Sequence, residues 1–153
     1  MLSVGEMMRH DIAVVPPHVP VRRVIEVKVD AGVEGVLVVD GRGRVVGSIG
    51  DEQLVAGLHA GRTRPWWRQL VADGGEFWTD EHLFSLVAAD IMLRRVAVVD
   101  PFTPAPSAIR LFDEYAVNVV AVVDHGLLAG AVFRGDLIRR LLLRDPFGHT
   151  AET

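Results

Sequence analysis

The chain has 153 residues, of which 50% are hydrophobic and 24% charged, and its formal net charge is −4. This composition is typical of a globular protein and excludes a general nucleic-acid binder, because phosphate contacts require a net basic face. The sequence contains no cysteine, no apolar run long enough to cross a bilayer, and no secretory pattern at its start. We therefore expect a cytoplasmic protein with no disulfide and no membrane partner.

The first part of the chain predicts the order strand, helix, strand, strand, helix. Pro16 and Pro17 end the first strand because proline donates no ladder hydrogen bond, and Pro20 suits the start of a helix. The glycines between Asp40 and Arg44 are typical of a hairpin turn. The predicted strands cover residues 12–15, 36–39 and 45–49, and the predicted helices begin at Val21 and Asp51.

Residues 60–87 differ from the sequence on either side of them. They contain every tryptophan of the chain, namely Trp66, Trp67 and Trp78. A flexible linker would be polar or rich in glycine and serine, so we expect this insert to be helical and to dock.

The second part of the chain predicts the same order of elements. The predicted strands cover residues 96–99, 119–123 and 128–133, and the predicted helices cover 106–115 and 136–143. The last helix carries a broad apolar side formed by Leu137, Ile138, Leu141 and Leu142. This side is wider than one core contact requires, which predicts a homodimer contact.

The two parts are copies of one another. Asp40 and Asp124 lie 84 residues apart, as do Met8 and Met92, whereas Gly47 and Gly130 lie 83 apart, so the second hairpin is shorter by one residue. A unit this small buries too little apolar surface to be secure alone, which predicts that the copies pack against each other and enclose clefts. The predicted organisation is repeat 1 over 1–59, insert over 60–87, repeat 2 over 88–144 and tail over 145–153.

The duplicated pattern resembles a CBS-domain pair, also called a Bateman module. Repeat 1 carries VLVVDGRGRVVGSIGDEQL and repeat 2 carries VAVVDHGLLAGAVFRGDLI. The insert RPWWRQLVADGGEF is similar to the linker of bacterial CBS-pair proteins that often carry a C-terminal BON domain; we expect none here, since the sequence stops at Thr153.

The resemblance implies an α+β fold in which two repeats pack about a pseudo-two-fold axis. It also implies a regulatory module rather than an enzyme, commonly dimeric, that binds AMP, ADP, ATP or S-adenosylmethionine in the cleft between the repeats. Such a ligand would regulate by favouring one packing of the repeats over another, and no cofactor would be required. A further protein partner is left unidentified.

In this family an Asp at the start of the last helix binds the ribose, because one carboxylate can accept hydrogen bonds from both hydroxyls. Repeat 2 has Asp136 at this position, Arg134 beside it for a phosphate, and Phe133 in place of the usual hydroxyl residue. The resemblance assigns the surroundings of the adenine to Arg95, Val96, Ala97, Asn118, Val119, Val120 and Ala121.

Repeat 1 departs further from the family pattern. Gly50 replaces the hydroxyl residue, Gln53 replaces the carboxylate, and the negative charge of Asp51 would repel a phosphate. We therefore expect a weaker second site, formed by Ala13, Gly35, Val36, Gly50 and Gln53.

Each of these residues also has a structural interpretation. Asp136 could simply favour a helix N-terminus, Phe133 could fill the core, and Arg134 could face solvent. If so, the chain would be an interaction scaffold that has lost nucleotide binding. A small hydrolase ranks behind both hypotheses, since no nucleophile–base set or metal-binding histidine spacing is visible, and we predict no catalytic or metal site.

Overall fold

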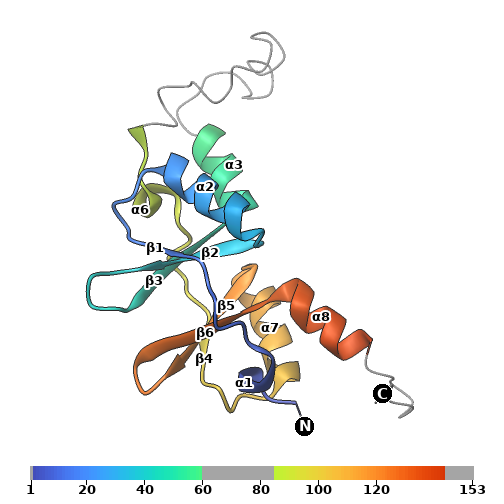
Figure 1. Ribbon diagram of the computed structural model, residues 1–153. Coiled ribbons are helices and arrows are strands. Elements are labelled where there is room, and N and C mark those ends of the chain that lie inside the picture. The colour runs from blue at the N-terminus through green and yellow to red at the C-terminus, as the bar shows by residue number, and fades with distance from the viewer. Residues whose placement is uncertain (1, 60–84, 144–153) are drawn as a thin grey trace. The chain divides into compact units, whose positions relative to one another are not determined.

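The computed structural model describes residues 2–59 and 85–143, and Figure 1 shows the arrangement of their elements. The predicted helical insert, apart from residues 85–87, and the whole of the predicted tail lie outside the described residues. The elements of repeat 1 are α1 (Val4–Met7), β1 (Val14–Val15), α2 (Val21–Ala31), β2 (Gly35–Val39), β3 (Val45–Gly50) and α3 (Asp51–His59). Those of repeat 2 are α6 (Ala88–Ile91), β4 (Val98–Val99), α7 (Ala105–Tyr115), β5 (Val119–Asp124), β6 (Leu127–Phe133) and α8 (Arg134–Leu142).

Each repeat contributes one three-stranded sheet, and the two sheets have the same topology. The orders are β1-β2-β3 and β4-β5-β6, with a parallel first pair and an antiparallel second pair. The register shifts between Val38 and Val39 in one sheet and between Val122 and Val123 in the other, which are equivalent positions 84 residues apart. The two sheets therefore share even the position at which their strand pairing is irregular.

The main helices agree with the predicted helices to within two residues at their starts. The last helix begins at Arg134 rather than at Asp136, because Phe133 at the end of β6 already serves as its N-cap. The two hairpin turns differ in length as predicted, and the shorter one uses positive φ at both His125 and Gly126. This is the geometry that matches the twist of two hydrogen-bonded strands.

Helices α2 and α7 end in the same way with different residues. Gly32 follows α2 and Ala116 follows α7, and both adopt the left-handed conformation with φ of 63° and 51°. Glycine tolerates this conformation, whereas alanine adopts it at a cost of about 1–2 kcal/mol. Repeat 2 therefore holds a strained helix end where repeat 1 does not.

The compact units of the structure do not coincide with the repeats. One unit, here called the repeat-1 unit, consists of Ala13–Arg95. The other, here called the repeat-2 unit, combines Met1–Ile12 with Val96–Thr153. The segment that precedes the first strand of each repeat is thus part of the unit built on the sheet of the other repeat. We call these segments the first docking segment (residues 2–12) and the second docking segment (residues 86–95).

The two docking segments are held by equivalent backbone hydrogen bonds. In the repeat-2 unit, Val4 donates to the carbonyl of Thr103 at 2.8 Å and Ala105 donates to the carbonyl of Leu2 at 2.8 Å. In the repeat-1 unit, Ala88 donates to the carbonyl of Val19 at 2.8 Å and Val21 donates to the carbonyl of Leu86 at 2.9 Å. The short helices α1 and α6, which were not predicted, carry these segments onto their sheets.

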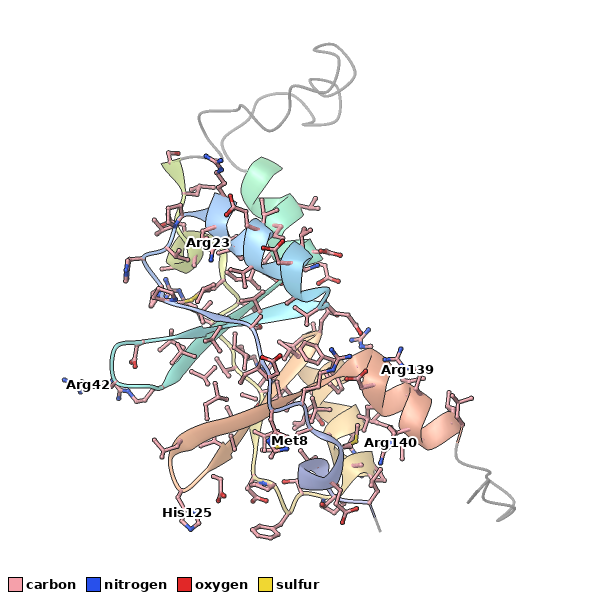
Figure 2. The ribbon with its side chains drawn as sticks, viewed as in Figure 1. Met8, Arg23, Arg42, His125, Arg139 and Arg140 are labelled. Carbon is pink, nitrogen blue, oxygen red and sulfur yellow. The ribbon has the colours of Figure 1, made fainter. Side chains whose placement is uncertain are left out.

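Two glycines make room for the docking segments. A Cβ atom added at Gly130 on β6 would lie 2.7 Å from the carbonyl oxygen of Arg9 and 2.8 Å from Sδ of Met8. The three atoms nearest to one added at Gly47 on β3 all belong to the side chain of Met92. Figure 2 labels Met8, which lies beside β6. Each glycine therefore permits close approach of a methionine-bearing segment to a strand.

The core of each unit consists mainly of valine and alanine from the central strand and the helices beside it. Helices α7 and α8 contact each other and pack on β5 and β6, and α2 and α3 pack on β2 and β3 (Figure 1). The largest fully buried side chains are Val4, Val21, Val24, Val36, Leu37, Val38, Ile49, Val120, Val122, Val132 and Leu137.

Candidate functional site

Asp136 is the centre of the candidate site in repeat 2. It lies in the first turn of α8, and its carboxylate accepts two hydrogen bonds from Arg9, from Nε at 2.6 Å and from Nη2 at 2.9 Å. Nη2 of Arg139, one turn along α8, also donates to this carboxylate. The hydrogen bond from Arg9 and the charges of both arginines hold the pKa of Asp136 below its ordinary value. The side chain is therefore an anion at neutral pH and acts only as an acceptor.

Arg9 also covers the aromatic ring next to this carboxylate. The guanidinium carbon of Arg9 lies 5.0 Å from the centroid of Phe133, a distance typical of a cation–π contact. Phe133 is the last residue of β6 and its side chain is buried. The acid, the ring and two arginines thus come together at the junction of β6 and α8, and we call this group (Arg9, Phe133, Asp136 and Arg139) the second-repeat site.

Arg134 lies at the same junction but its side chain faces α7. Its Nη2 donates to the carbonyl oxygens of Phe112 at 3.4 Å and Val117 at 3.3 Å. Its guanidinium also lies 5.9 Å from the centroid of the Phe112 ring. Arg134 therefore ties α8 to α7 and is exposed to solvent beside the second-repeat site.

The remaining predicted contacts of repeat 2 fall on two strands and their ends. The amide of Ala121 donates to the carbonyl of Ala97 at 2.9 Å, which joins the segment before β4 to β5. Ala97, Val119, Val120 and Ala121 are buried, Val96 and Asn118 are half-buried, and Arg95 is exposed. Arg95 belongs to the repeat-1 unit, whereas the other residues of this set belong to the repeat-2 unit.

The equivalent positions of repeat 1 form a different arrangement. Oε1 of Gln53 accepts a hydrogen bond from the backbone amide of Gly50 at 2.7 Å, so this side chain caps its own helix. Asp51 forms an ion pair of 2.7 Å with Lys28 of α2. Of the other residues predicted for this site, Gly35, Val36 and Gly50 are buried, and Ala13 accepts from the amide of Leu37 at 3.2 Å.

The contact between α2 and α3 in repeat 1 therefore differs in charge from the contact between α7 and α8 in repeat 2. Lys28 and Asp51 pair in repeat 1, and the equivalent positions in repeat 2 hold Phe112 and Arg134. A carboxylate stands at this position in one repeat and a guanidinium in the other, so an anion would meet opposite charges at the two sites.

Sequence reasoning missed Arg9 as a member of the site. Arg9 lies 127 residues from Asp136 in the chain, and no local pattern connects them. The 84-residue offset makes Arg9 equivalent to Leu93, and both residues exchange two backbone hydrogen bonds with the third strand of a sheet, through Ala131 and Ser48 respectively. The repeat offset alone pairs Arg9 with Leu93. Placing Arg9 next to Asp136 also requires knowing that the first docking segment docks on β6.

Among residues 2–59 and 85–143, no three His, Asp or Glu side chains gather as they would around a metal ion. Within the same described residues, no helix combines the length and apolar character of a membrane span.

Comparison with known proteins gives a consistent result. The family model of the CBS domain matches twice, over residues 4–60 and 87–143. CBSX2 in complex with AMP has a similar solved structure, with 28% identity and a TM-score of 0.68 over 94% of this chain and 98% of that chain. The CBS-pair protein CBSX2 from Arabidopsis thaliana matches with 28% identity and a TM-score of 0.69, over 92% and 94%.

A CBS domain-containing protein of unknown function from Bacillus anthracis shares 16% identity and a TM-score of 0.70, over 94% of this chain and 95% of that chain, which is a likeness of fold. No curated protein matches the chain. The predicted resemblance and the predicted α+β fold of two repeats are confirmed, and the chain belongs to the CBS domain family.

Proposed function

We propose that this protein is a regulatory module that binds an adenosine-containing ligand, AMP, ADP, ATP or S-adenosylmethionine, mainly at repeat 2. The observation that carries the proposal is the ionised carboxylate of Asp136 among arginines at the start of α8. We propose no catalytic role and no required cofactor.

Each part of the ligand has a chemical counterpart at this site. Asp136 can accept hydrogen bonds from both ribose hydroxyls, and the arginines can form charge-assisted bonds with phosphate oxygens. The backbone amides at the start of α8 are further hydrogen-bond donors for phosphate oxygens. In the proposed arrangement the adenine lies against residues 96–97 and 118–121 of the same unit.

Repeat 1 is proposed as the weaker or silent site. Its Gln53 is a neutral amide that caps its own helix through the amide of Gly50, so a ribose would gain no charge-assisted hydrogen bond there. The exposed carboxylate of Asp51 adds a charge that repels phosphate, although Lys28 offsets part of it.

The similarity to CBSX2, which has been crystallised with AMP, supports an adenine nucleotide as the ligand. At 28% identity over most of both chains, a shared ligand class is the simplest expectation, and this chain keeps the acid that such a ligand needs.

Thermal unfolding with AMP, ADP, ATP and S-adenosylmethionine tests the proposal. At a ligand concentration a hundred times the dissociation constant, binding to the folded state alone should stabilise it by about 2.7 kcal/mol. At least one of these ligands at millimolar concentration should raise the unfolding midpoint of the native protein. Asp136→Ala should abolish this rise, because the ribose loses its acceptor.

Two further variants make the result specific. Asp136→Asn keeps the shape of the side chain but not its charge and should lose the effect as well, whereas Gln53→Ala at the equivalent position of repeat 1 should retain it. Absence of a shift with all four ligands, or an equal loss in Gln53→Ala, would contradict the proposal.

A second candidate function is an interaction scaffold without a nucleotide. It is favoured by the fact that Asp136 is already paired with two arginines and that Phe133 is buried, so the junction is satisfied without a ligand. Under this alternative, Asp136→Ala would leave the partner interaction unchanged and no adenosine compound would alter the unfolding midpoint.

We also propose a homodimer formed through the outer side of α8. Ile138 is 43% exposed, Leu142 is 72% exposed and Leu143, just after the helix, is 79% exposed, which is unusual for three neighbouring apolar side chains. Sedimentation should give the mass of two chains, and Leu142→Glu should shift the population toward one chain. A native protein that sediments as one chain at all concentrations would contradict the dimer.

A further inference from the structure

Arg9 covers the two groups of the second-repeat site that a neutral nucleoside would contact, namely the carboxylate of Asp136 and the ring of Phe133. Its Nε and Nη2 atoms donate to the two different oxygens of Asp136, at 2.6 Å and 2.9 Å, in the fork geometry that arginine forms with carboxylates. The same guanidinium covers the ring of Phe133. Arg139 adds a further bond to the oxygen that Arg9 reaches through Nη2. Both acceptor oxygens of Asp136 are therefore occupied.

The backbone of Arg9 is held by hydrogen bonds that do not involve its side chain, and the side chain is partly exposed. Its amide donates to the carbonyl of Ala131 at 2.8 Å, and its carbonyl accepts from the amide of Ala131 at 3.0 Å. The side chain of Arg9 is 43% exposed, whereas that of Asp136 is 17% exposed. A ligand can thus displace the guanidinium from Asp136 without moving the docking segment.

What Arg9 does after displacement depends on the charge of the ligand. An adenosine hydroxyl pair takes the carboxylate and gives the guanidinium no new partner. A nucleotide takes the carboxylate and also brings a phosphate, which arginine binds through the same fork. S-adenosylmethionine has a sulfonium group at the 5′ position where a nucleotide has its phosphate, and this cation would repel Arg9; its carboxylate lies at the far end of the methionyl chain.

We propose that Arg9 selects anionic adenosine ligands at the second-repeat site by exchanging Asp136 for the ligand phosphate. This inference rests on the proposed function and deepens it from an adenosine-containing ligand to AMP, ADP or ATP. At the equivalent position of repeat 1, Leu93 lies against β3 in place of Arg9, and a leucine side chain cannot bind a phosphate.

Calorimetric titration of AMP and adenosine into the native protein and Arg9→Met tests the inference. The native protein should bind AMP at least about tenfold more tightly than adenosine, a ratio of the size that one charge-assisted contact provides. In Arg9→Met, adenosine should bind more tightly than to the native protein and AMP more weakly, so that the two affinities converge. Methionine retains a flexible apolar side chain over Phe133.

Two variants serve as controls. Arg42→Met removes an exposed arginine of the β2–β3 turn and should keep the native preference (Figure 2). Arg9→Lys keeps the charge without the fork and should retain a reduced preference for AMP, which also covers the case that Arg9→Met does not fold.

The possible results separate the inference from the proposed function. An unchanged preference in Arg9→Met, together with AMP binding by the native protein, would overturn the inference and leave the proposed function standing. Weaker adenosine binding in Arg9→Met would also overturn it. If neither ligand bound the native protein or either variant at position 9, both proposals would fall.

Discussion

A protein that lacks residues 1–9 is expected to lose the cooperative unfolding of its repeat-2 unit while its repeat-1 sheet stays folded. The deletion removes Leu2, Val4 and Met7, which are 8%, 0% and 9% exposed and belong to the repeat-2 unit. Burial of three such side chains contributes about 4–9 kcal/mol, which is comparable with the whole stability of a small domain, about 5–15 kcal/mol. The backbone bonds of Val4 and Leu2 to the segment before α7 are lost as well.

Hydrogen exchange measures this outcome strand by strand. The amides of β5 and β6 should exchange rapidly in the truncated protein, whereas those of β2 and β3 should keep their protection. The control substitutions Glu6→Ala and His10→Ala change exposed residues of the same docking segment and should leave both sheets protected. If β5 and β6 kept full protection after the deletion, the assignment of the first docking segment to the repeat-2 unit would be wrong.

Gly130→Ala is expected to lower the free energy of unfolding by about 2–3 kcal/mol, in the upper part of the range of about 1–3 kcal/mol typical of overpacking. The added Cβ would lie 2.7 Å from the carbonyl oxygen of Arg9, which is backbone and accepts a hydrogen bond from Ala131. The first docking segment would therefore have to move away from β6, and the contact of Met8 with the strand would be disturbed too.

Gly47→Ala is the matched comparison within the same chain. The three atoms nearest to its Cβ belong to the side chain of Met92, and the closest two, Sδ and Cγ, move when that side chain adopts another rotamer, so a smaller loss of about 1 kcal/mol is expected. Urea unfolding of both variants gives the difference. A larger loss for Gly47→Ala than for Gly130→Ala would contradict the account of how the docking segments pack.

The duplication made most of the fold predictable. The strands and the longer helices follow from apolar runs, prolines and hairpin glycines that occur twice at one offset, and each is found close to its predicted position. Helices α1 and α6 have only four residues each, which is too short for a helical period to show. The docking of each segment onto the sheet of the other repeat is a non-local contact that no local pattern encodes.

The candidate site was predictable in part for the same reason. Asp136 could be placed at the start of a helix and Gln53 at the equivalent position, because both lie in the duplicated pattern. The pairing of Asp136 with Arg139 is local, at a spacing of three residues along one helix, but its pairing with Arg9 depends on the docking of residues 2–12. Likewise, Lys28 could not be linked to Asp51 before α2 and α3 were placed on one sheet.

The inversion of charge between the repeats explains why they should differ in function. A guanidinium stands in repeat 2 where a carboxylate stands in repeat 1, and the arginine-paired acid Asp136 of repeat 2 corresponds to an amide, Gln53, that caps its own helix. The duplicated positions thus carry different charges in the two repeats, which is the basis for proposing repeat 2 as the main site.

The number of nucleotides that each chain binds tests the central proposal most directly. Titration of the native protein with AMP should give one equivalent per chain, and this binding should vanish in Asp136→Asn and persist in Gln53→Ala. Two equal equivalents, or binding that survives in Asp136→Asn, would contradict the proposal that repeat 2 carries the main site.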